Sequence, residues 1–270
     1  MTDAVVRFTD EHDDDDHDDD FATLTAPQAP SAPQQRWRSL RPFVPKRMQP
    51  FLRGMRRRMQ WRRWHRLEEP FRTIFPYTQV NTTRQHNLLR LCEIIEREHV
   101  PGAVVECGVL DGGAAALMAW GTRESARPVH LFDAWEGLPA PSAHDGADAS
   151  AWTGEVVGSP LRVSAVMRKL KIDRRRVAFH RGWFDQTFPH ADIQQIALLH
   201  VDADFYDPTR LCLERWYPHV ASGGFIEIDD YDSFAGCRRA VDEFLRAHPE
   251  LSLEFAGKYA VARACFIRKP

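Results

Sequence analysis

Two short acidic clusters in this 270-residue chain have the residue types and spacing of a cation site. Asp202 and Asp204 end one apolar run, and Asp229 and Asp230 end another. Ligands of open α/β sheets bind where parallel strands end, and Mg²⁺ prefers carboxylate oxygens. Adjacent Asp229 and Asp230 repel each other unless a positive charge lies between them. We therefore predict that Asp202, Asp229 and Asp230 bind a divalent metal, and we assign Asp204 and Asp207 to turn formation and helix capping.

A glycine-bearing turn precedes these clusters and is typical of a ligand-binding loop. Residues 105–113 read as a strand, a turn with Gly108 and Gly112, and a helix start, and such glycines let the backbone approach a ligand. The turn matches neither a dinucleotide nor a nucleotide-triphosphate motif. Asp133 ends the next strand, where a carboxylate can accept hydrogen bonds from ribose hydroxyls, and Gly182-Trp183 follows a third strand. Taken alone, Trp183 could equally pack in the hydrophobic core or stack on an adenine. The three turns together predict a nucleoside site.

The elements that must position these residues alternate between helix and strand from about residue 77. An apolar stripe through Leu88, Cys92 and Ile95 predicts a helix, and Asp207-Pro208 predicts a helix start with Asp207 as N-cap. Strands are expected at 103–106, 129–133, 177–180, 196–201 and 225–228, with a closing pair at 253–255 and 262–267. This alternation predicts an α/β fold with a doubly wound, mostly parallel sheet. The unpatterned residues 136–160 are expected to form a lid or binding loop.

The composition excludes several classes of protein. With 43% hydrophobic residues, the chain can bury one sizeable core. No apolar stretch approaches the roughly 18–20 residues of a membrane span, and the N-terminus lacks the apolar core of a signal peptide. The five cysteines suggest neither a disulfide framework nor a zinc site. We therefore expect a cytoplasmic protein.

Charge divides the chain into three parts. Residues 10–20 are nearly all acidic and residues 22–35 are rich in Ala, Pro and Gln, so residues 1–35 are expected to be disordered. Residues 36–66 carry twelve Arg or Lys and no acid, so residues 36–69 are expected to form a basic arm, helical in one interpretation. Residues 70–270 are expected to form the folded domain.

The basic arm allows three interpretations. It can be solvated or paired with the acidic run, or it can bind an anionic membrane surface or an acidic partner as an amphipathic helix over residues 56–64. Nucleic acid is disfavoured, because no recognisable nucleic-acid module accompanies the arm. Peripheral membrane attachment and self-association are left open.

Several segments in consistent order resemble the macrocin O-methyltransferase family, whose members include sugar-tailoring enzymes of tylosin and mycinamicin biosynthesis. The segments are Glu106-Cys107-Gly108-Val109 with Gly112-Gly113, residues 133–139, Gly182-Trp183-Phe184 with Phe188-Pro189, residues 228–231 and residues 237–241. The resemblance covers about residues 77–244 and leaves the N-terminal extension outside. It departs from the family where Leu110-Asp111 replace tryptophan and arginine, where Ala134-Trp135 replace serine and phenylalanine, and where Ala203 replaces glycine.

The resemblance implies a Rossmann-like class I methyltransferase fold, S-adenosylmethionine as methyl donor and Mg²⁺ as metal. The implied donor-binding residues are Tyr77, Thr78, Glu106, Gly108, Gly112, Asp133, Gly182 and Trp183. Asp202, Asp229 and Asp230 match the metal residues of the family.

Methyl transfer to oxygen needs a partly deprotonated hydroxyl, whose pKa a bound cation can lower. Asp202 and His144 are the candidate general bases, although an exposed loop histidine is the alternative for His144. The expected acceptor is a sugar hydroxyl of a glycosylated natural product or a surface glycan. A catechol or other phenol would chelate the metal equally well. A non-catalytic glycan-binding or scaffolding module is the hypothesis from another class.

Overall fold

The computed structural model describes residues 67–257 and 263–270, and within them the chain forms a seven-stranded sheet. The strands are β1 (Ala103–Cys107), β2 (Val129–Asp133), β3 (Val177–Arg181), β4 (Ile196–Val201), β5 (Val220–Ile228), β6 (Leu253–Ala256) and β7 (Ala264–Arg268). Their order is β3-β2-β1-β4-β5-β7-β6. The first five are parallel, whereas β7 runs antiparallel to β5 and β6. The predicted doubly wound, mostly parallel sheet with a closing pair is confirmed.

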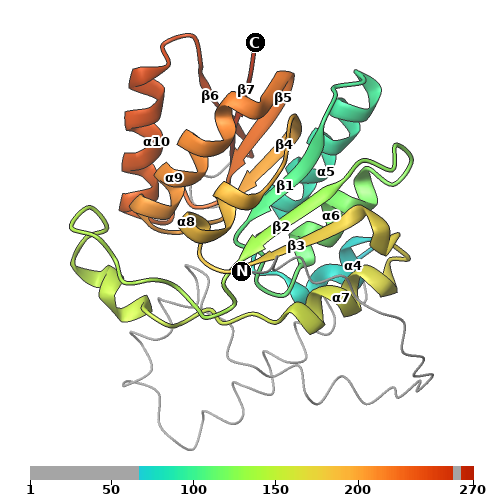
Figure 1. Ribbon diagram of the computed structural model, residues 1–270, viewed down its shortest axis with the longest axis horizontal. Coiled ribbons are helices and arrows are strands. Elements are labelled where there is room, and N and C mark those ends of the chain that lie inside the picture. Colours follow the sequence, from blue (N-terminus) through green and yellow to red (C-terminus); the bar gives the residue numbers. More distant parts are fainter. Residues whose placement is uncertain (1–66, 258–262) are drawn as a thin grey trace, which may run out of the picture.

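Helices cover both faces of this sheet (Figure 1). One face carries α4 (Phe71–Ile74), α5 (Thr82–Arg97), α6 (Gly113–Gly121) and α7 (Pro160–Lys169), and the other carries α8 (Phe184–Thr187), α9 (Tyr206–Trp216) and α10 (Ala235–Ala247). Short 3₁₀ helices are η3 (Phe75–Tyr77), η4 (Ala147–Trp152), η5 (Arg174–Arg176), η6 (Phe188–His190) and η7 (Tyr217–His219). Successive side chains along each strand point to opposite faces of the sheet and enter two apolar clusters. Val104 and Leu198 belong to one cluster, and Val105 and Leu199 belong to the other.

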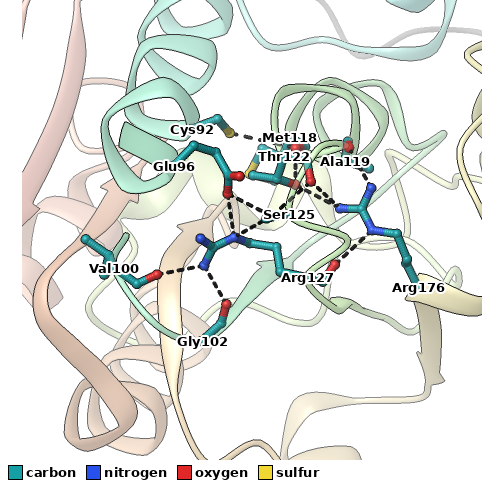
Figure 2. Close-up of polar contacts among 10 residues, drawn as sticks. All are labelled: Cys92, Glu96, Val100, Gly102, Met118, Ala119, Thr122, Ser125, Arg127 and Arg176. Atoms are coloured by element: carbon teal, nitrogen blue, oxygen red, sulfur yellow. Dashed lines mark hydrogen bonds and ion pairs between the residues drawn. The ribbon is translucent and has the colours of Figure 1, made fainter. Parts of the chain in front are cut away.

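Arg176 bonds the C-terminal end of α6, and Arg127 connects it to α5 (Figure 2). Arg176 donates to the carbonyls of Ala119 and Thr122 at 3.3 and 2.9 Å, where the end of α6 leaves acceptors without helical partners. Its Nε donates to the Arg127 carbonyl at 3.0 Å, and Arg127 in turn bonds Glu96 of α5 at 2.6 Å. These contacts join the C-terminal end of α6 to α5 and to the segment that leads into β2.

The structure differs from the sequence predictions at several element ends. Helix α9 begins at Tyr206 with Phe205 as N-cap, so the prediction of Asp207 as N-cap is wrong. Strand β5 begins at Val220 and includes the glycine pair expected to precede it. Residues 136–160 contain η4 and a parallel bridge between Leu138 and Thr153.

Predictions about residues 1–66 lie outside the described part of the chain. Among residues 67–257 and 263–270, no helix has both the length and the apolarity that crossing a membrane requires.

Candidate functional site

A pocket of about 540 Å³ lies where β1, β2, β4 and β5 end. Ten of the predicted site residues line it, namely Tyr77, Thr78, Glu106, Gly108, Asp133, Gly182, Trp183, Asp202, Asp229 and Asp230. They come from loops far apart in the sequence, because parallel strands bring their carboxyl ends to one edge. The structure therefore brings the acidic clusters and the glycine turn to one pocket.

Three carboxylates form a compact cluster in this pocket. Asp202, Asp204 and Asp230 each offer an oxygen, and these oxygens lie within 4.8 Å of one another. Asp204, which the sequence assigned to a turn, therefore joins the cluster, with a left-handed φ of 56°. Within the described residues, no other group of three or more such side chains could hold a metal.

Asp229 lies beside the cluster in a buried ion pair. Its Oδ2 accepts a hydrogen bond from Arg84 Nη1 at 2.7 Å, and both side chains are 7% exposed. Arg84 also donates to the Arg263 carbonyl and to Ser233 Oγ. Oδ1 of Asp229 and Oδ2 of Asp230 are buried without a hydrogen-bond partner. Asp229 therefore keeps one oxygen free for a ligand while Arg84 holds the other.

The crowded carboxylates raise one another's pKa values. Burial and the charges of Asp229 and Asp230 raise the pKa of Asp202 well above its usual value, and burial and the same two charges do so for Asp204. Burial and Asp229 raise the pKa of Asp230 to about 6. Burial opposes the charge on Arg84, but Asp229, Asp230 and Asp202 outweigh it and raise the pKa of the guanidinium. The single positive charge of Arg84 does not balance the four neighbouring carboxylates. A divalent cation would supply the missing positive charge.

Gly108 allows the glycine turn to approach the acidic cluster. Its φ is +90°, and a Cβ at this position would overlap the carbonyl oxygen of Asp202. The neighbouring strand ends are joined by a hydrogen bond from Asp202 N to the Cys107 carbonyl at 2.9 Å. Gly112 does not line the pocket; it is the N-cap of α6, with a φ of +83° and no room for a Cβ beside Val163.

Asp133 ties the glycine turn to the end of β2. Its Oδ2 accepts hydrogen bonds from the backbone N–H groups of Val109 and Leu110 at 2.7 and 2.9 Å, and Oδ1 accepts one from Trp135 N at 2.6 Å. Burial raises its pKa, although these bonds act in the opposite direction. Trp135 also donates from Nε1 to the Leu110 carbonyl at 2.8 Å. The carboxylate thus shapes the pocket. Both lone pairs of Oδ2 are taken by the glycine turn, whereas Oδ1 keeps one lone pair for a ligand.

Tyr77 and Thr78 line the pocket beside the glycine turn. A Cβ on Gly113 would come within 2.6 Å of Thr78 Cβ and 2.7 Å of the Tyr77 carbonyl, so this glycine lets α6 begin against them. Arg162 lies over the Tyr77 ring at 4.9 Å and pairs with Asp111 at 2.9 Å. The two residues therefore have a fixed place beside the turn.

Glu106 lines the pocket from the α5 and α6 face of the sheet, and His200 lies behind it on the same face. They are opposed in the β1–β4 register, and His200 Nδ1 is 3.0 Å from Glu106 Oε1. Burial opposes the charge on His200, but the glutamates at 106 and 227 outweigh it and raise its pKa to about 8. Glu227 is the register neighbour of His200 on β5, and burial raises its pKa to about 8.

His144 does not line the pocket. Its ring packs edge-on against Tyr206, with ring centroids 4.4 Å apart. The adjacent Asp145 is buried: its Oδ1 accepts a hydrogen bond from Tyr206 N at 2.6 Å, and its Oδ2 accepts one from Ser142 N at 2.7 Å. This part of the loop is therefore anchored on the start of α9, immediately after Asp204.

Sequence reasoning missed Arg84, Asp145 and the place of Asp204 in the cluster. Arg84 could have been found from the sequence. It precedes Leu88 by four residues and Leu91 by seven, so the helical spacing places a charged side chain on the buried face of α5. Asp145 had none, because its partner Tyr206 is 61 residues away.

Comparisons with known proteins identify one family. The family described as Macrocin-O-methyltransferase (TylF) matches residues 24–253. This match begins well before residue 77, so it includes part of the N-terminal stretch that the sequence motifs left outside the resemblance.

Individual relatives agree with this family. The chain is 34% identical over 180 residues, 62% of this chain and 67% of the relative, to the 8-demethyl-8-(2,3-dimethoxy-alpha-L-rhamnosyl)-tetracenomycin-C 4'-O-methyltransferase of Streptomyces olivaceus. It is 33% identical over 184 residues, 64% of this chain and 71% of the relative, to the mycinamicin III 3''-O-methyltransferase of Micromonospora griseorubida. The solved structure of the O-methyltransferase NovP matches with a TM-score of 0.63 at 29% identity, covering 72% of this chain and 82% of that one.

Proposed function

Because the chain belongs to the macrocin O-methyltransferase family and is an S-adenosylmethionine-dependent O-methyltransferase, we propose that it methylates a sugar hydroxyl with the help of Mg²⁺. The acceptor would be a glycosylated small molecule or a surface glycan. The observation that carries the proposal is the cluster of Asp202, Asp204 and Asp230, which shares one pocket with the glycine turn.

The donor would occupy the side of the pocket formed by the glycine turn. Gly108 gives its backbone close access, Asp133 would offer the remaining lone pair of Oδ1 to the ribose, and Trp183 would offer an aromatic face to the adenine. Tyr77, Thr78 and Gly182 line the same pocket and would complete the site. Gly112 would act indirectly, by allowing α6 to begin at the turn.

The residues present fit a hard divalent cation. Carboxylate oxygens are the ligands that Mg²⁺ prefers, and the free buried oxygens of Asp229 and Asp230 face an excess of negative charge. Asp202, Asp229 and Asp230 would hold the ion, with Asp204 close enough to contribute. When bound, the ion would lower the pKa of the acceptor hydroxyl and help to orient it.

The side chains would then move one proton and exclude water. The acceptor oxygen forms a bond to the donor methyl group as the carbon–sulfur bond breaks, and the hydroxyl proton passes to a carboxylate. Asp202 and Asp204 are the bases that the geometry favours, because both line the pocket and His144 does not. Trp152, from the loop 136–160, packs edge-on against Phe234 with ring centroids 6.0 Å apart, and both line the pocket, where they would border the acceptor and help to exclude water.

The sugar acceptor is supported by the relatives, since one of them is named for methylating the 4'-oxygen of a rhamnosyl tetracenomycin. The test is a screen of donor plus Mg²⁺ against rhamnosides, other deoxysugar glycosides and catechols. Turnover of a rhamnoside or another deoxysugar glycoside supports the proposal. If only catechols are methylated, the acceptor is a phenol instead of a sugar, and the metal part of the proposal still stands.

The metal is tested by turnover and by direct binding of Mn²⁺, followed by electron paramagnetic resonance. Asp229→Asn should abolish turnover and weaken Mn²⁺ binding, because it removes a negative charge from the metal site. Donor binding should stay nearly intact, because no donor contact is lost. The matched control is Asp148→Asn, on an exposed part of the loop 136–160. Turnover that survives both Asp229→Asn and excess chelator would refute the metal.

The donor site is tested by calorimetry with S-adenosylhomocysteine, the demethylated donor. Asp133→Ala should weaken binding at least tenfold, because a ribose contact of about 1 kcal/mol is lost and two N–H groups of the glycine turn lose their acceptor. The exposed Glu136→Ala is the control. Undiminished binding by Asp133→Ala would exclude this carboxylate from the donor site.

The domain boundary and the basic arm belong to the same proposal. Catalysis would reside in residues 70–270, and residues 36–69 would attach the enzyme to an anionic surface or an acidic partner. In the full-length chain, glutamine at Arg56, Arg57, Arg58, Arg62 and Arg63 should abolish binding to anionic vesicles and preserve turnover. Vesicle binding by a wild-type chain that transfers no methyl group to any acceptor would instead favour a binding module.

A further inference from the structure

A row of three ionisable side chains crosses the centre of the sheet beneath the donor side of the pocket. Glu106 on β1 opposes His200 on β4, and His200 opposes Glu227 on β5. All three side chains are at least 99% buried. Of the three, only Glu106 lines the pocket. Burying charged groups this deeply is costly unless they have partners, so the row calls for a functional explanation.

The contacts within this row are unequal. His200 Nδ1 lies 3.0 Å from Glu106 Oε1, whereas Glu106 Oε2 is buried without a hydrogen-bond partner. A carboxylate can only accept hydrogen bonds, so the ring nitrogen facing it carries the proton. The histidine thus fixes one oxygen of Glu106, and rotation about the carboxylate axis is restricted. The second oxygen then has a defined direction. His200 Nε2 and both Glu227 oxygens are also unpartnered, but only Glu106 lines the pocket, so only its oxygen can receive a donor from a ligand bound there.

The position of Glu106 narrows the choice of that donor. Strand β1 lies between β2, which ends at Asp133, and β4, which leads into Asp202. Glu106 is therefore between the proposed ribose contact and the acidic cluster. S-adenosylmethionine carries two cationic groups, a sulfonium that has no N–H or O–H and an ammonium that can donate three hydrogen bonds. Of these two cationic groups only the ammonium can donate to an unpartnered carboxylate oxygen, and the ribose hydroxyls and adenine are assigned to Asp133 and Trp183.

We propose that His200 is a positioning residue for the methyl donor, whose Nδ1–H holds Glu106 Oε1 so that Oε2 binds the ammonium group of the donor's methionine tail. His200 does not line the pocket, so it acts through Glu106 and touches no reacting atom. The inference rests on the proposed donor site. It is independent of the metal and of the acceptor, because donor binding is measured without either.

The experiment compares two ligands on the full-length protein by calorimetry in the presence of chelator. S-adenosylhomocysteine carries the ammonium, whereas 5'-methylthioadenosine lacks the whole amino-acid tail. Glu106→Gln and His200→Leu should each lower the affinity for S-adenosylhomocysteine at least tenfold. Each should change the affinity for methylthioadenosine by less than twofold. Retained methylthioadenosine binding also verifies that each variant is folded around the nucleoside.

Three further variants separate positioning from a general structural effect. His200→Asn places an amide N–H near the lost Nδ1–H and should recover most of the affinity. The double variant with Glu106→Gln and His200→Leu should bind S-adenosylhomocysteine no more weakly than Glu106→Gln alone, because both changes remove one interaction. Glu227→Gln, on the far side of His200, should leave the ratio of the two affinities within twofold of wild type.

The outcomes that overturn the proposal are equally specific. If His200→Leu lowers the affinity for both ligands equally, the histidine has only a structural role. Full affinity of Glu106→Gln for S-adenosylhomocysteine would mean that this carboxylate does not meet the ammonium. Additive losses in the double variant, no rescue by His200→Asn, or an equal loss in Glu227→Gln would each show that His200 does not act by orienting Glu106.

Discussion

Arg84 and Asp229 form a buried ion pair in which Nη1 and Oδ2 are 2.7 Å apart, and it joins the first turn of α5 to the end of β5. The same guanidinium bonds Ser233 Oγ at 3.3 Å and the Arg263 carbonyl at 3.2 Å. One side chain therefore fixes three segments that meet at the acidic cluster. It also supplies positive charge to carboxylates that would otherwise repel one another.

Arg84→Met should lower the free energy of unfolding by about 3–5 kcal/mol, because Asp229 would be left buried without its partner. The matched control is Arg210→Met, which breaks an exposed pair with Glu214 and should cost no more than about 1 kcal/mol. Urea denaturation in the presence of chelator measures both. The double change of Arg84→Met with Asp229→Asn should cost less than Arg84→Met alone. A loss as small as that of Arg210→Met would mean that the pair adds little to stability.

Gly108→Ala should be far more damaging than Gly146→Ala, although both glycines have a positive φ, +90° and +83°, that side-chain-bearing residues rarely adopt. At Gly146 nothing lies within 4 Å of an added Cβ, so the cost is the backbone strain alone, about 1–3 kcal/mol. At Gly108 the methyl group would overlap the Asp202 carbonyl, which should add at least about 2 kcal/mol.

Thermal unfolding and calorimetry with S-adenosylhomocysteine measure both variants, and donor affinity should fall in Gly108→Ala alone. Equal effects of the two substitutions would mean that the close approach of the turn to β4 is not required.

His180 makes stability depend on pH at the edge of the sheet. It stacks on Phe132 and lies 3.0 Å from His130, and burial together with His130 lowers its pKa from 6.5 to about 4. Between these values the unfolded chain binds more protons, so stability is fully present above pH 6.5 and falls as the pH drops toward 4.

His180→Phe keeps a ring against Phe132 and removes this titration. Between pH 7 and pH 4.5 the variant should lose about 2 kcal/mol less stability than wild type, a value reduced from the full shift because the side chain is partly exposed. Urea denaturation across this range provides the comparison. Parallel curves for the two proteins would assign the acid sensitivity to other groups.

Apolar runs and glycine turns made most of the fold predictable from the sequence. Strands β1 to β4 were expected within a residue of their bounds, because each is a short apolar run between breakers. The meeting of Asp202 and Asp230 in one pocket followed from the parallel sheet, since strand order alone brings their ends together.

Tertiary contacts that no local pattern encodes account for the rest. Asp207-Pro208 has the composition of a helix start, yet α9 begins at Tyr206, whose N–H is bonded by Asp145 from a distant loop. Asp204 looked like a turn former and is one, but its turn directs the carboxylate toward Asp230. The metal role of Asp229 was argued from its neighbour, its place at a strand end and the family resemblance, none of which indicates that Arg84 bonds one of its oxygens.

Asp145 should control how the loop 136–160 meets the acceptor without affecting the donor. Its Oδ1 accepts the first N–H of α9 from Tyr206, and its Oδ2 accepts the N–H and Oγ–H of Ser142. Gly236 leaves the space that this carboxylate fills, since a Cβ there would overlap Oδ1. Asp145→Ala should cost about 1–2 kcal/mol of stability, as the loss of a helix cap does, and should speed amide exchange at Tyr206 and across the loop.

Because Asp145 lies outside the pocket, its loss should raise the acceptor KM and leave S-adenosylhomocysteine affinity within twofold. Asp148→Ala, exposed on the same loop, is the control and should alter neither quantity. Hydrogen exchange followed by mass spectrometry, together with steady-state kinetics, gives both readouts. Faster exchange with an unchanged acceptor KM would mean that the anchored part of the loop takes no part in acceptor binding. A parallel loss of donor affinity would show that the loop supports the whole pocket rather than its acceptor side.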